Sequence, residues 1–131
     1  MIRFLSEALI LAIHEDQIRL YGGIYGIRDA ARLDAALHVP QAQFDGQFLH
    51  TSILQMAAAY GFHLCQNHPF IDGNKRAAGM AMFTFLKLNG LEPVVAEFDY
   101  YVKMMEVASG QLSKEQLAVW LQTAVKSIEE I

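Results

Sequence analysis

The sequence predicts an all-α protein, a single domain over residues 1–131 built as a bundle of about six helices. Three observations lead to this prediction. Apolar residues recur at helical spacing along most of the chain, and capping residues or glycines bound these stretches. Only the segments "GGIYGIR" and "LEPVVAE" are expected to be extended. A chain of 131 residues suffices for one substantial core, and no repeat or low-complexity linker divides it.

The composition excludes several classes of protein. Apolar residues make up 53% of the chain and charged residues 18%, which excludes disorder. No apolar run approaches the roughly 18 residues that a membrane span needs. The single cysteine, Cys65, permits no intrachain disulfide and indicates a reducing cytoplasm. A net charge of −4 and a pI near 5.6 argue against sequence-independent nucleic-acid binding. We therefore expect a cytoplasmic protein that binds neither membrane nor nucleic acid directly.

The first two helices are marked by their caps. Ser6 is expected to cap a helix that carries an apolar face and ends at Gly22. Because Glu7 interrupts the apolar run and no small-residue cleavage site follows, this stretch is interpreted as a helix and not as a signal peptide. Asp29 is expected to cap the second helix, "DAARLDAALH", which Pro40 closes.

The third and fourth helices are expected to form the centre of the bundle. They run from about residue 51 to 67 and from 74 to 89, and both are apolar on nearly every face. The link "HPFIDGN" is short, so the two helices are neighbours in space. A fifth helix over about 97–109 ends at Gly110. A sixth begins with the capping-box pattern Ser113 to Gln116 and carries an apolar stripe that extends to Ile128.

Polar side chains gather where the two central helices meet. Gly73 lets the backbone approach a ligand closely, Asn74 is expected to cap the fourth helix, and the free N–H groups of its first turn then form an anion site. Lys75 and Arg76 lie about 100° apart around the helix, so they reach different oxygens of an extended anion such as a polyphosphate. Charged groups near a core are costly unless they are paired, solvated or bound to a ligand.

Two further residues of this cluster suggest a reaction. Asp72, a carboxylate inside an anion site, makes sense if it holds Mg²⁺ against phosphate oxygens. His68 is the one group of the loop that accepts a proton near neutral pH. Together with the anion site, these residues fit nucleotide-dependent transfer to a hydroxyl group.

Each of these residues alone also fits ordinary turn and capping chemistry. Basic side chains in the first turn oppose the helix dipole, however, so a purely structural account leaves Lys75 and Arg76 unexplained. The remaining histidines carry no ligand spacing and are interpreted as structural, and Cys65 as a small core residue. These histidines are His14, His38, His50 and His63. The methionines of the fourth and fifth helices, with one of the third, are interpreted as core filling: Met80, Met82, Met104, Met105 and Met56.

The stretch "HPFIDGNKR", residues 68–76, resembles the signature of the Fic/Doc superfamily. Lys75 resembles the Doc branch, the death-on-curing toxins of bacterial toxin–antitoxin modules. The segments "YGGIYGIRDAARLDAAL" and "FLKLNG" are similar to the same branch, so the resemblance covers most of the chain. It implies one Fic/Doc domain over residues 1–131, a helical bundle with the motif loop between two central helices.

The resemblance implies an ATP-dependent transferase. Fic proteins usually have Gly at position 75 and a second Arg at position 79, and they attach the adenylyl group of ATP to a target hydroxyl. Here these positions hold Lys75 and Gly79. This matches Doc, in which ATP lies reversed and the γ-phosphoryl group passes to a threonine of translation elongation factor Tu, which blocks translation. Gly73 is Fic-like, since Doc has Ala there. Adenylyl transfer remains an alternative, as does a catalytically silent helical module that binds a partner.

The resemblance also implies a role for each residue of the motif. His68 would deprotonate the attacking hydroxyl and Asp72 would hold Mg²⁺. The amides around Gly73 and Asn74 would cradle the phosphates of ATP. Lys75 and Arg76 would bind the phosphate charge that develops during transfer.

Two protein partners are expected from the same resemblance. The link over residues 39–48 occupies the position of the family's flap, which docks the target segment by backbone pairing. Fic proteins that inhibit themselves carry a Ser/Thr-x-x-x-Glu motif, and this chain contains none. We therefore expect a separate, Phd-like antitoxin whose disordered tail folds as a helix into an apolar groove near the site.

Overall fold

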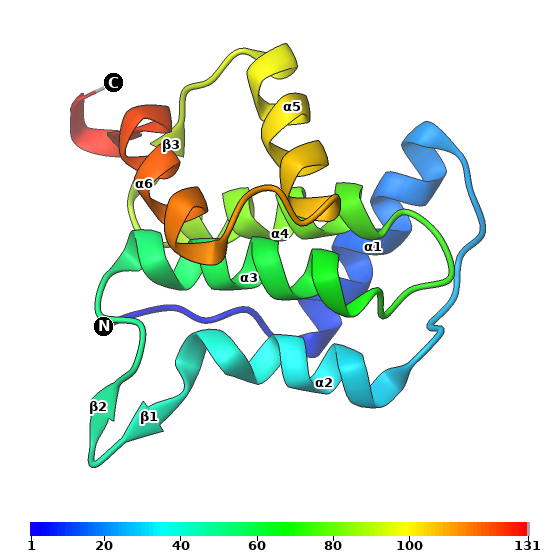
Figure 1. The fold of residues 1–131 in the computed structure, drawn as a ribbon, viewed down its shortest axis with the longest axis horizontal. Coiled ribbons are helices and arrows are strands. Elements are labelled where there is room, and N and C mark those ends of the chain that lie inside the picture. The colour runs from blue at the N-terminus through cyan, green and yellow to red at the C-terminus, as the bar shows by residue number, and fades with distance from the viewer. Residues whose placement is uncertain (131) are drawn as a thin grey trace.

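Six α-helices make up most of the computed structural model, which describes residues 1–130 (Figure 1). The helices are α1 (Glu7–Tyr21), α2 (Ala30–His38), α3 (Ile53–Asn67), α4 (Asn74–Leu88), α5 (Glu97–Ala108) and α6 (Lys114–Ala124). Two short antiparallel ladders join β1 (Gln43–Phe44) to β2 (Gln47–Phe48) and β3 (Leu91–Pro93) to β4 (Val125–Ser127). Two 3₁₀ turns, η1 (Val39–Gln41) and η2 (Ile128–Glu130), complete the described part of the chain. The predicted all-α bundle is confirmed.

Side-chain caps begin four of these helices, and three of them, Ser6, Asp29 and Ser113, were expected. The side chains of Ser6, Asp29 and Ser52 each accept a hydrogen bond from a backbone N–H of the first turn that follows. Ser113 and Gln116 form the complete capping box of α6. Each such cap contributes about 1 kcal/mol to helix stability. Sequence and structure therefore agree on where these helices begin.

Two details of the sequence prediction were wrong. The sixth helix ends at Ala124, and Val125 pairs with Pro93 in the β3–β4 ladder, so the apolar stripe does not continue to Ile128 as helix. Asn74 does not cap α4. Gly73 occupies that position with a left-handed φ of 73°, which L residues other than glycine rarely adopt, and it leaves the Asn74 side chain free for other contacts.

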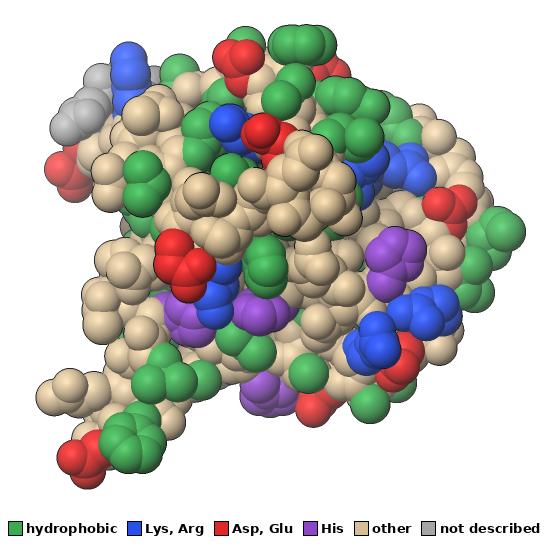
Figure 2. Space-filling view, in the orientation of Figure 1, with side chains coloured by type: hydrophobic (Ala, Val, Ile, Leu, Met, Phe, Trp, Pro, Cys, Tyr) green, Lys and Arg blue, Asp and Glu red, His purple; other side chains and the backbone are tan. Residues whose placement is uncertain are grey.

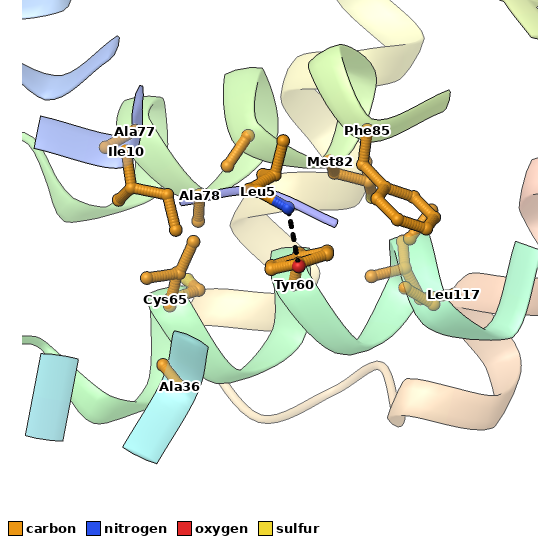
Figure 3. Packing of buried hydrophobic residues seen from close by; sticks show 14 of the residues in the cluster. Leu5, Ile10, Ala36, Tyr60, Cys65, Ala77, Ala78, Met82, Phe85 and Leu117 are labelled. Carbon is orange, nitrogen blue, oxygen red and sulfur yellow. Dashed lines mark hydrogen bonds between the residues drawn. The ribbon is translucent and has the colours of Figure 1, made fainter. Parts of the chain in front are cut away.

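The helices α3 and α4 lie side by side at the centre, as predicted, and α6, α2 and α1 pack around them (Figure 1). Figure 3 shows the interface, where Phe85 of α4 packs against Tyr60 of α3 with ring centroids 5.1 Å apart, and Ala77 lies toward Ile10 of α1. The Leu5 N–H donates to Tyr60 Oη over 3.0 Å, which satisfies this buried hydroxyl. Burial raises the pKa of Tyr60 to about 12, so it stays neutral. Truncation of a core aromatic such as Phe85 to Ala costs roughly 3–5 kcal/mol.

No helix among residues 1–130 is both long and apolar enough to cross a membrane.

The methionines divide between core and surface. Met56, Met82 and Met104 are buried, as expected of core filling, whereas Met105 is exposed and contacts the motif helix. The prediction of core filling is therefore correct for Met56, Met82 and Met104 and wrong for Met105 of α5.

Candidate functional site

The loop between α3 and α4 is held by a segment far away in sequence. Ile27 and Phe70 form an antiparallel bridge, and the Ile71 N–H donates to the Gly26 carbonyl over 3.0 Å. The N–H groups of Arg28 and Asp29 both donate to the Pro69 carbonyl, over 2.7 and 3.0 Å. The extended "GGIYGIR" segment thus serves as a partner strand for the motif loop, and it satisfies backbone groups that a bare loop would leave unpaired.

A buried histidine supports the same loop from the core. His14 of α1 has no exposed surface, and its ring stacks on Phe70 with centroids 3.8 Å apart and an angle of 5° between the planes. Its Nε2 lies 2.7 Å from the Asp72 carbonyl oxygen, which can only accept, so this nitrogen carries the proton. His14 was predicted to be a structural histidine, and this is correct. The sequence did not reveal that the part of the fold which His14 supports is the motif loop.

His68 is an exposed residue at the C-terminal end of α3, in a left-handed conformation with φ 53° and ψ 51°. Histidine is among the residues that tolerate this conformation. The guanidinium of Arg28 stabilises the turn, because it donates to the carbonyl oxygens of His68 over 2.8 Å and of Asn67 over 3.3 Å. The imidazole is therefore presented at the surface on a fixed backbone.

The side chain of Asn74 is buried and fixes the state of the His68 ring. Its Oδ1 accepts from the Phe70 N–H over 2.8 Å, and this donor determines which way the amide faces. Its Nδ2 therefore donates, to the Phe70 carbonyl over 3.0 Å and to His68 Nδ1 over 3.1 Å. Because Nδ1 accepts, the neutral His68 ring carries its proton on Nε2 and its lone pair on Nδ1.

Backbone amides at the start of α4 provide the anion site. No side chain caps this helix end, so the first-turn N–H groups and the helix dipole are available to an anion. A Cβ at Gly73 would lie 3.0 Å from the Ile18 side chain and 3.3 Å from the Arg76 guanidinium. The glycine therefore lets the loop pack closely against α1 at this helix end.

Asp72 lies exposed beside this helix end. Its Oδ1 accepts from the Gly73 N–H over 2.8 Å and its Oδ2 from the Ile24 N–H over 3.3 Å. Among residues 1–130 no three His, Cys, Asp or Glu side chains gather as a metal-binding group. A single exposed carboxylate nevertheless suits Mg²⁺, which keeps several waters and commonly binds one or two carboxylates together with substrate phosphates. The chemistry of the Asp72 carboxylate therefore fits the predicted role of a metal ligand.

The two motif cations point to different neighbours. Lys75 Nζ lies 2.7 Å from the Met105 sulfur and 5.7 Å from the centre of the Tyr101 ring, both on α5. Arg76 instead donates to carbonyl oxygens at the end of α1, to Gly22 over 3.0 Å and to Gln17 over 3.4 Å. The expected divergence of the two side chains is therefore observed. Arg76 also has a structural role, since it neutralises the negative end of the α1 dipole.

A cavity of about 420 Å³ opens between α1, α4 and α5, with Lys75 and Arg76 at its wall. This volume lies in the usual range of cofactor pockets. Tyr21, Tyr100 and Tyr101 line the rest of it together with two methionines. The motif thus borders two connected features, the anion site at the helix end and an aromatic cavity beside it. Sequence reasoning missed the cavity, because its tyrosines come from helices outside the motif.

A second group of titratable side chains lies away from the motif. Lys114 Nζ is 3.1 Å from His50 Nε2 and 3.3 Å from His63 Nε2, although the sequence offered no spacing that connects these residues. Burial, followed by the charge of Lys114, lowers the pKa of His63 to about 4, and the same causes lower the pKa of His50. On the face shown in Figure 2, histidine side chains gather beside a basic and an acidic one. Both rings therefore stay neutral and accept from the lysine.

The remaining candidate residues stay in structural roles. Cys65 is buried, and this burial raises the pKa of its thiol to about 11, so it is not a reactive thiolate. His38 caps a turn of its own helix through the Asp34 carbonyl, 2.8 Å from Nδ1. The link over residues 39–48 folds as the β1–β2 hairpin, with Phe44 exposed at its tip. The segment in which a flap was predicted is therefore the η1 turn followed by a short two-stranded ladder.

Comparisons with known proteins agree with this geometry. Residues 4–86, more than half of the chain, match the Fic/DOC family. The chain is similar to Toxin Doc of Mycolicibacterium smegmatis, with 42% identity over 79 residues, which span only 60% of either protein. It is similar to Protein kinase doc of Escherichia phage P1, with 28% identity over 131 residues that cover 97% of this chain and 99% of the relative. The motif, the fold and these matches together place the chain in the Fic/DOC family.

Proposed function

We propose that the protein is a toxin of a toxin–antitoxin module that transfers the γ-phosphoryl group of ATP to a serine or threonine hydroxyl of a target protein. One observation carries the choice of reaction. At Gly79, where Fic-type adenylyl transferases have their second arginine, an added Cβ would lie 2.7 Å from Cζ of Tyr100 and closer still to its hydroxyl oxygen. The arginine is thus missing, and in this structure the Tyr100 ring occupies the space that it would need. The similarity to Protein kinase doc over nearly the whole chain supports the same reaction.

The residues of the loop divide the chemistry among them. The target hydroxyl oxygen forms a bond to the γ-phosphorus while the bond from that phosphorus to the bridging oxygen breaks, and ADP leaves with the electron pair. The hydroxyl proton passes to the lone pair of His68 Nδ1, which exchanges its hydrogen bond from Asn74 Nδ2 for the target hydroxyl as the substrate binds. Amides of the first turn of α4 and the side chain of Lys75 stabilise the negative charge on the transferred group. Arg76 holds the start of α4 against the end of α1 through its hydrogen bonds to the Gly22 and Gln17 carbonyl oxygens.

Asp72 is the residue that would hold Mg²⁺, which when bound neutralises phosphate charge. Its carboxylate is fixed by the Gly73 and Ile24 amides and still has lone pairs facing outward. Asp72 therefore places one oxygen ligand at the edge of the anion site.

The target and the inhibitor are proposed from the same features. Translation elongation factor Tu is the proposed target, and the β1–β2 hairpin is the proposed dock for its modified segment, since a two-stranded ladder with exposed edges can pair with an extended peptide. A separate, Phd-like antitoxin is the proposed inhibitor. The absence of a Ser/Thr-x-x-x-Glu motif from the sequence and the name of the relative Toxin Doc support a separate inhibitor.

Labelled ATP tests the reaction directly. The protein is incubated with purified elongation factor Tu and Mg²⁺, and with ATP labelled at either the α or the γ phosphate. Phosphoryl transfer predicts label from the γ position only, with ADP as the second product. Label from the α position would support adenylyl transfer, the second candidate. The observation that favours this candidate is Gly73, a Fic-like residue with a positive φ. Absence of label from both positions, with ATP bound, would support a silent binding module.

A further inference from the structure

Two histidines far from the motif direct their Nε2 atoms at one point, which the ammonium group of Lys114 occupies. The Lys114 Nζ lies 3.1 Å from His50 Nε2 and 3.3 Å from His63 Nε2. An ammonium group can only donate hydrogen bonds, so both Nε2 atoms accept, and each ring carries its proton on Nδ1. Two imidazole lone pairs therefore converge on a single positively charged atom.

The backbone on either side of this point is ordered. His63 belongs to α3, and the rings of Phe62 and His63 meet edge to face, at 86° with centroids 5.2 Å apart. His50 lies just before α3, where the N–H and the hydroxyl of Thr51 both donate to Gln55 Oε1, over 2.7 and 3.0 Å. Ligands that are already held in place lose little freedom when they bind, so such an arrangement favours binding.

The orientation of the His50 ring is unfavourable for its other nitrogen. His50 Nδ1 is buried and has no hydrogen-bond partner within residues 1–130. Because Nδ1 carries the proton, a buried donor is left unsatisfied. The ring nevertheless keeps Nε2 aimed at the shared point. An unsatisfied buried polar atom calls for an explanation, and a functional role of the ring is one that the geometry supports.

A cavity of about 560 Å³ borders the cluster between α3 and α6. His50, Lys114 and Glu115 line one part of it, and the other walls consist mostly of apolar and amide side chains. The converging lone pairs and the Glu115 carboxylate disfavour an anion here and favour a cation. Imidazole nitrogen is a ligand for zinc, copper and nickel, whereas Mg²⁺ prefers oxygen. The chemistry of the cluster therefore selects a transition metal ion.

We propose that His50 and His63 bind a divalent transition metal ion such as Zn²⁺, which takes the place of the Lys114 ammonium group. The lysine side chain moves into the cavity, and both rings close in, because a bond from zinc to a histidine nitrogen measures about 2.0–2.1 Å. No third His, Cys, Asp or Glu joins them as a metal-binding group in the described part of the chain, so water from the cavity completes the coordination. The site uses no residue of the motif and is independent of the proposed function.

Calorimetric titration with Zn²⁺ tests this site. His50→Gln and His63→Gln should each weaken binding by more than about tenfold, since even the loss of a residue behind a metal ligand costs roughly 10–100-fold in affinity. Lys114→Ala should tighten binding severalfold, because the competing ammonium group and its charge are removed. His38→Gln and His68→Gln replace exposed histidines and are the matched controls, which should bind as the wild-type protein does. Mg²⁺ should give no heat that depends on His50 or His63.

Electron paramagnetic resonance with Cu²⁺ gives a direct readout that needs no change within the site. The spectrum of the His38→Gln/His68→Gln protein should show two imidazole nitrogens bound to one copper ion. A spectrum with one nitrogen or none would overturn the proposal. Weaker Zn²⁺ binding by Lys114→Ala would also overturn it, because the lysine would then assist the ligand instead of competing with it. Loss of Zn²⁺ binding in His68→Gln, or a wild-type protein that binds no Zn²⁺, would have the same meaning.

Discussion

His14 Nε2 donates a hydrogen bond to the Asp72 carbonyl over 2.7 Å, which joins a fully buried side chain of α1 to the exposed motif loop 58 residues later. The same ring stacks on Phe70, so one histidine supports the loop both by its face and by its edge. Its other nitrogen, Nδ1, is buried without a hydrogen-bond partner among the described residues. A buried polar atom left in this way is costly, and its retention is reasonable where the ring is needed at a functional loop.

Replacement of His14 by Phe should separate these two contributions. Phenylalanine keeps the stack on Phe70 but leaves the Asp72 carbonyl without its donor, a loss of about 1–3 kcal/mol of unfolding free energy. Phosphoryl transfer should fall further than the stability change explains, since the loop carries Asp72. Urea denaturation and the γ-label assay measure the two effects. An unchanged unfolding midpoint together with full activity would show that the bond has no role.

His68→Ala tests the base. Transfer should fall by roughly 10²–10⁴ because the proton acceptor is lost. Stability should change by less than about 1 kcal/mol because the ring is exposed. His68→Asn is a useful companion, since asparagine also tolerates the left-handed conformation that this position requires. His38→Ala, an exposed histidine of α2, is the control and should keep full activity. A folded His68→Ala protein with normal labelling of its target would exclude the assignment.

Asn74→Asp should reverse the tautomer of His68. A carboxylate still accepts from the Phe70 N–H, but its second oxygen faces the Phe70 carbonyl and His68 Nδ1, so that it attracts a proton to Nδ1. We expect a loss of about 1–3 kcal/mol from the carboxylate–carbonyl repulsion. The ¹⁵N shifts of the His68 ring report the tautomer without reference to activity. Identical ring shifts in wild type and variant would show that Asn74 does not set the tautomer.

Gly79 and Tyr100 should be strongly coupled in stability. Gly79→Ala is expected to cost about 1–3 kcal/mol in the wild-type background, because the new methyl group overlaps the Tyr100 hydroxyl. The cost should largely vanish when Tyr100 is already Ala. A double-mutant cycle by chemical denaturation measures this coupling. Additive single effects would mean that Tyr100 moves aside freely, and the argument from steric exclusion of an arginine would then fail.

Stability should decrease in mild acid because of His63. Its pKa is lowered from 6.5 to about 4 in the folded protein, so between these values the unfolded chain binds the extra proton. The contribution is therefore complete above pH 6.5 and is lost as the pH falls toward 4. Since the ring is partly solvated, we expect roughly 1 kcal/mol and not the full shift. His63→Gln should flatten the dependence of the urea midpoint between pH 4.5 and 7, whereas His38→Gln should leave it intact. Equal slopes in both variants would refute this origin.

The sequence predicted the helices well because caps and terminators are local. Ser6, Asp29 and Ser113 act on backbone groups within three residues, and the structure places them as expected. The motif residues were likewise adjacent in the sequence, so their meeting at one helix end followed from one short loop. What escaped prediction was made by contacts between distant segments. The Ile27–Phe70 bridge and the two histidines on Lys114 carry no spacing that a single sequence displays.

The prediction that Asn74 caps α4 failed for a different reason. Its residue type is typical of a helix cap, and that local preference suggested the wrong partner. The structure instead gives the cap position to Gly73, because only a left-handed residue there turns the chain into α4 with the loop held against α1. The Asn74 amide is then free to bind Phe70 and His68. Tertiary geometry therefore overrode the cap role that the sequence predicted.

Arg28 lies 40 residues before His68 and yet donates a hydrogen bond to its carbonyl oxygen. The nine residues of the motif are therefore not a portable unit. Grafting "HPFIDGNKR" between two helices of an unrelated scaffold would transfer the reactive groups without the guanidinium, the strand at Ile27 or the histidine beneath Phe70. The residues that support the loop run from His14 to Arg76, about half of the molecule, and α5 adds Tyr101 and Met105 beside Lys75. A designer who wishes to transplant or minimise this chemistry must move that whole piece.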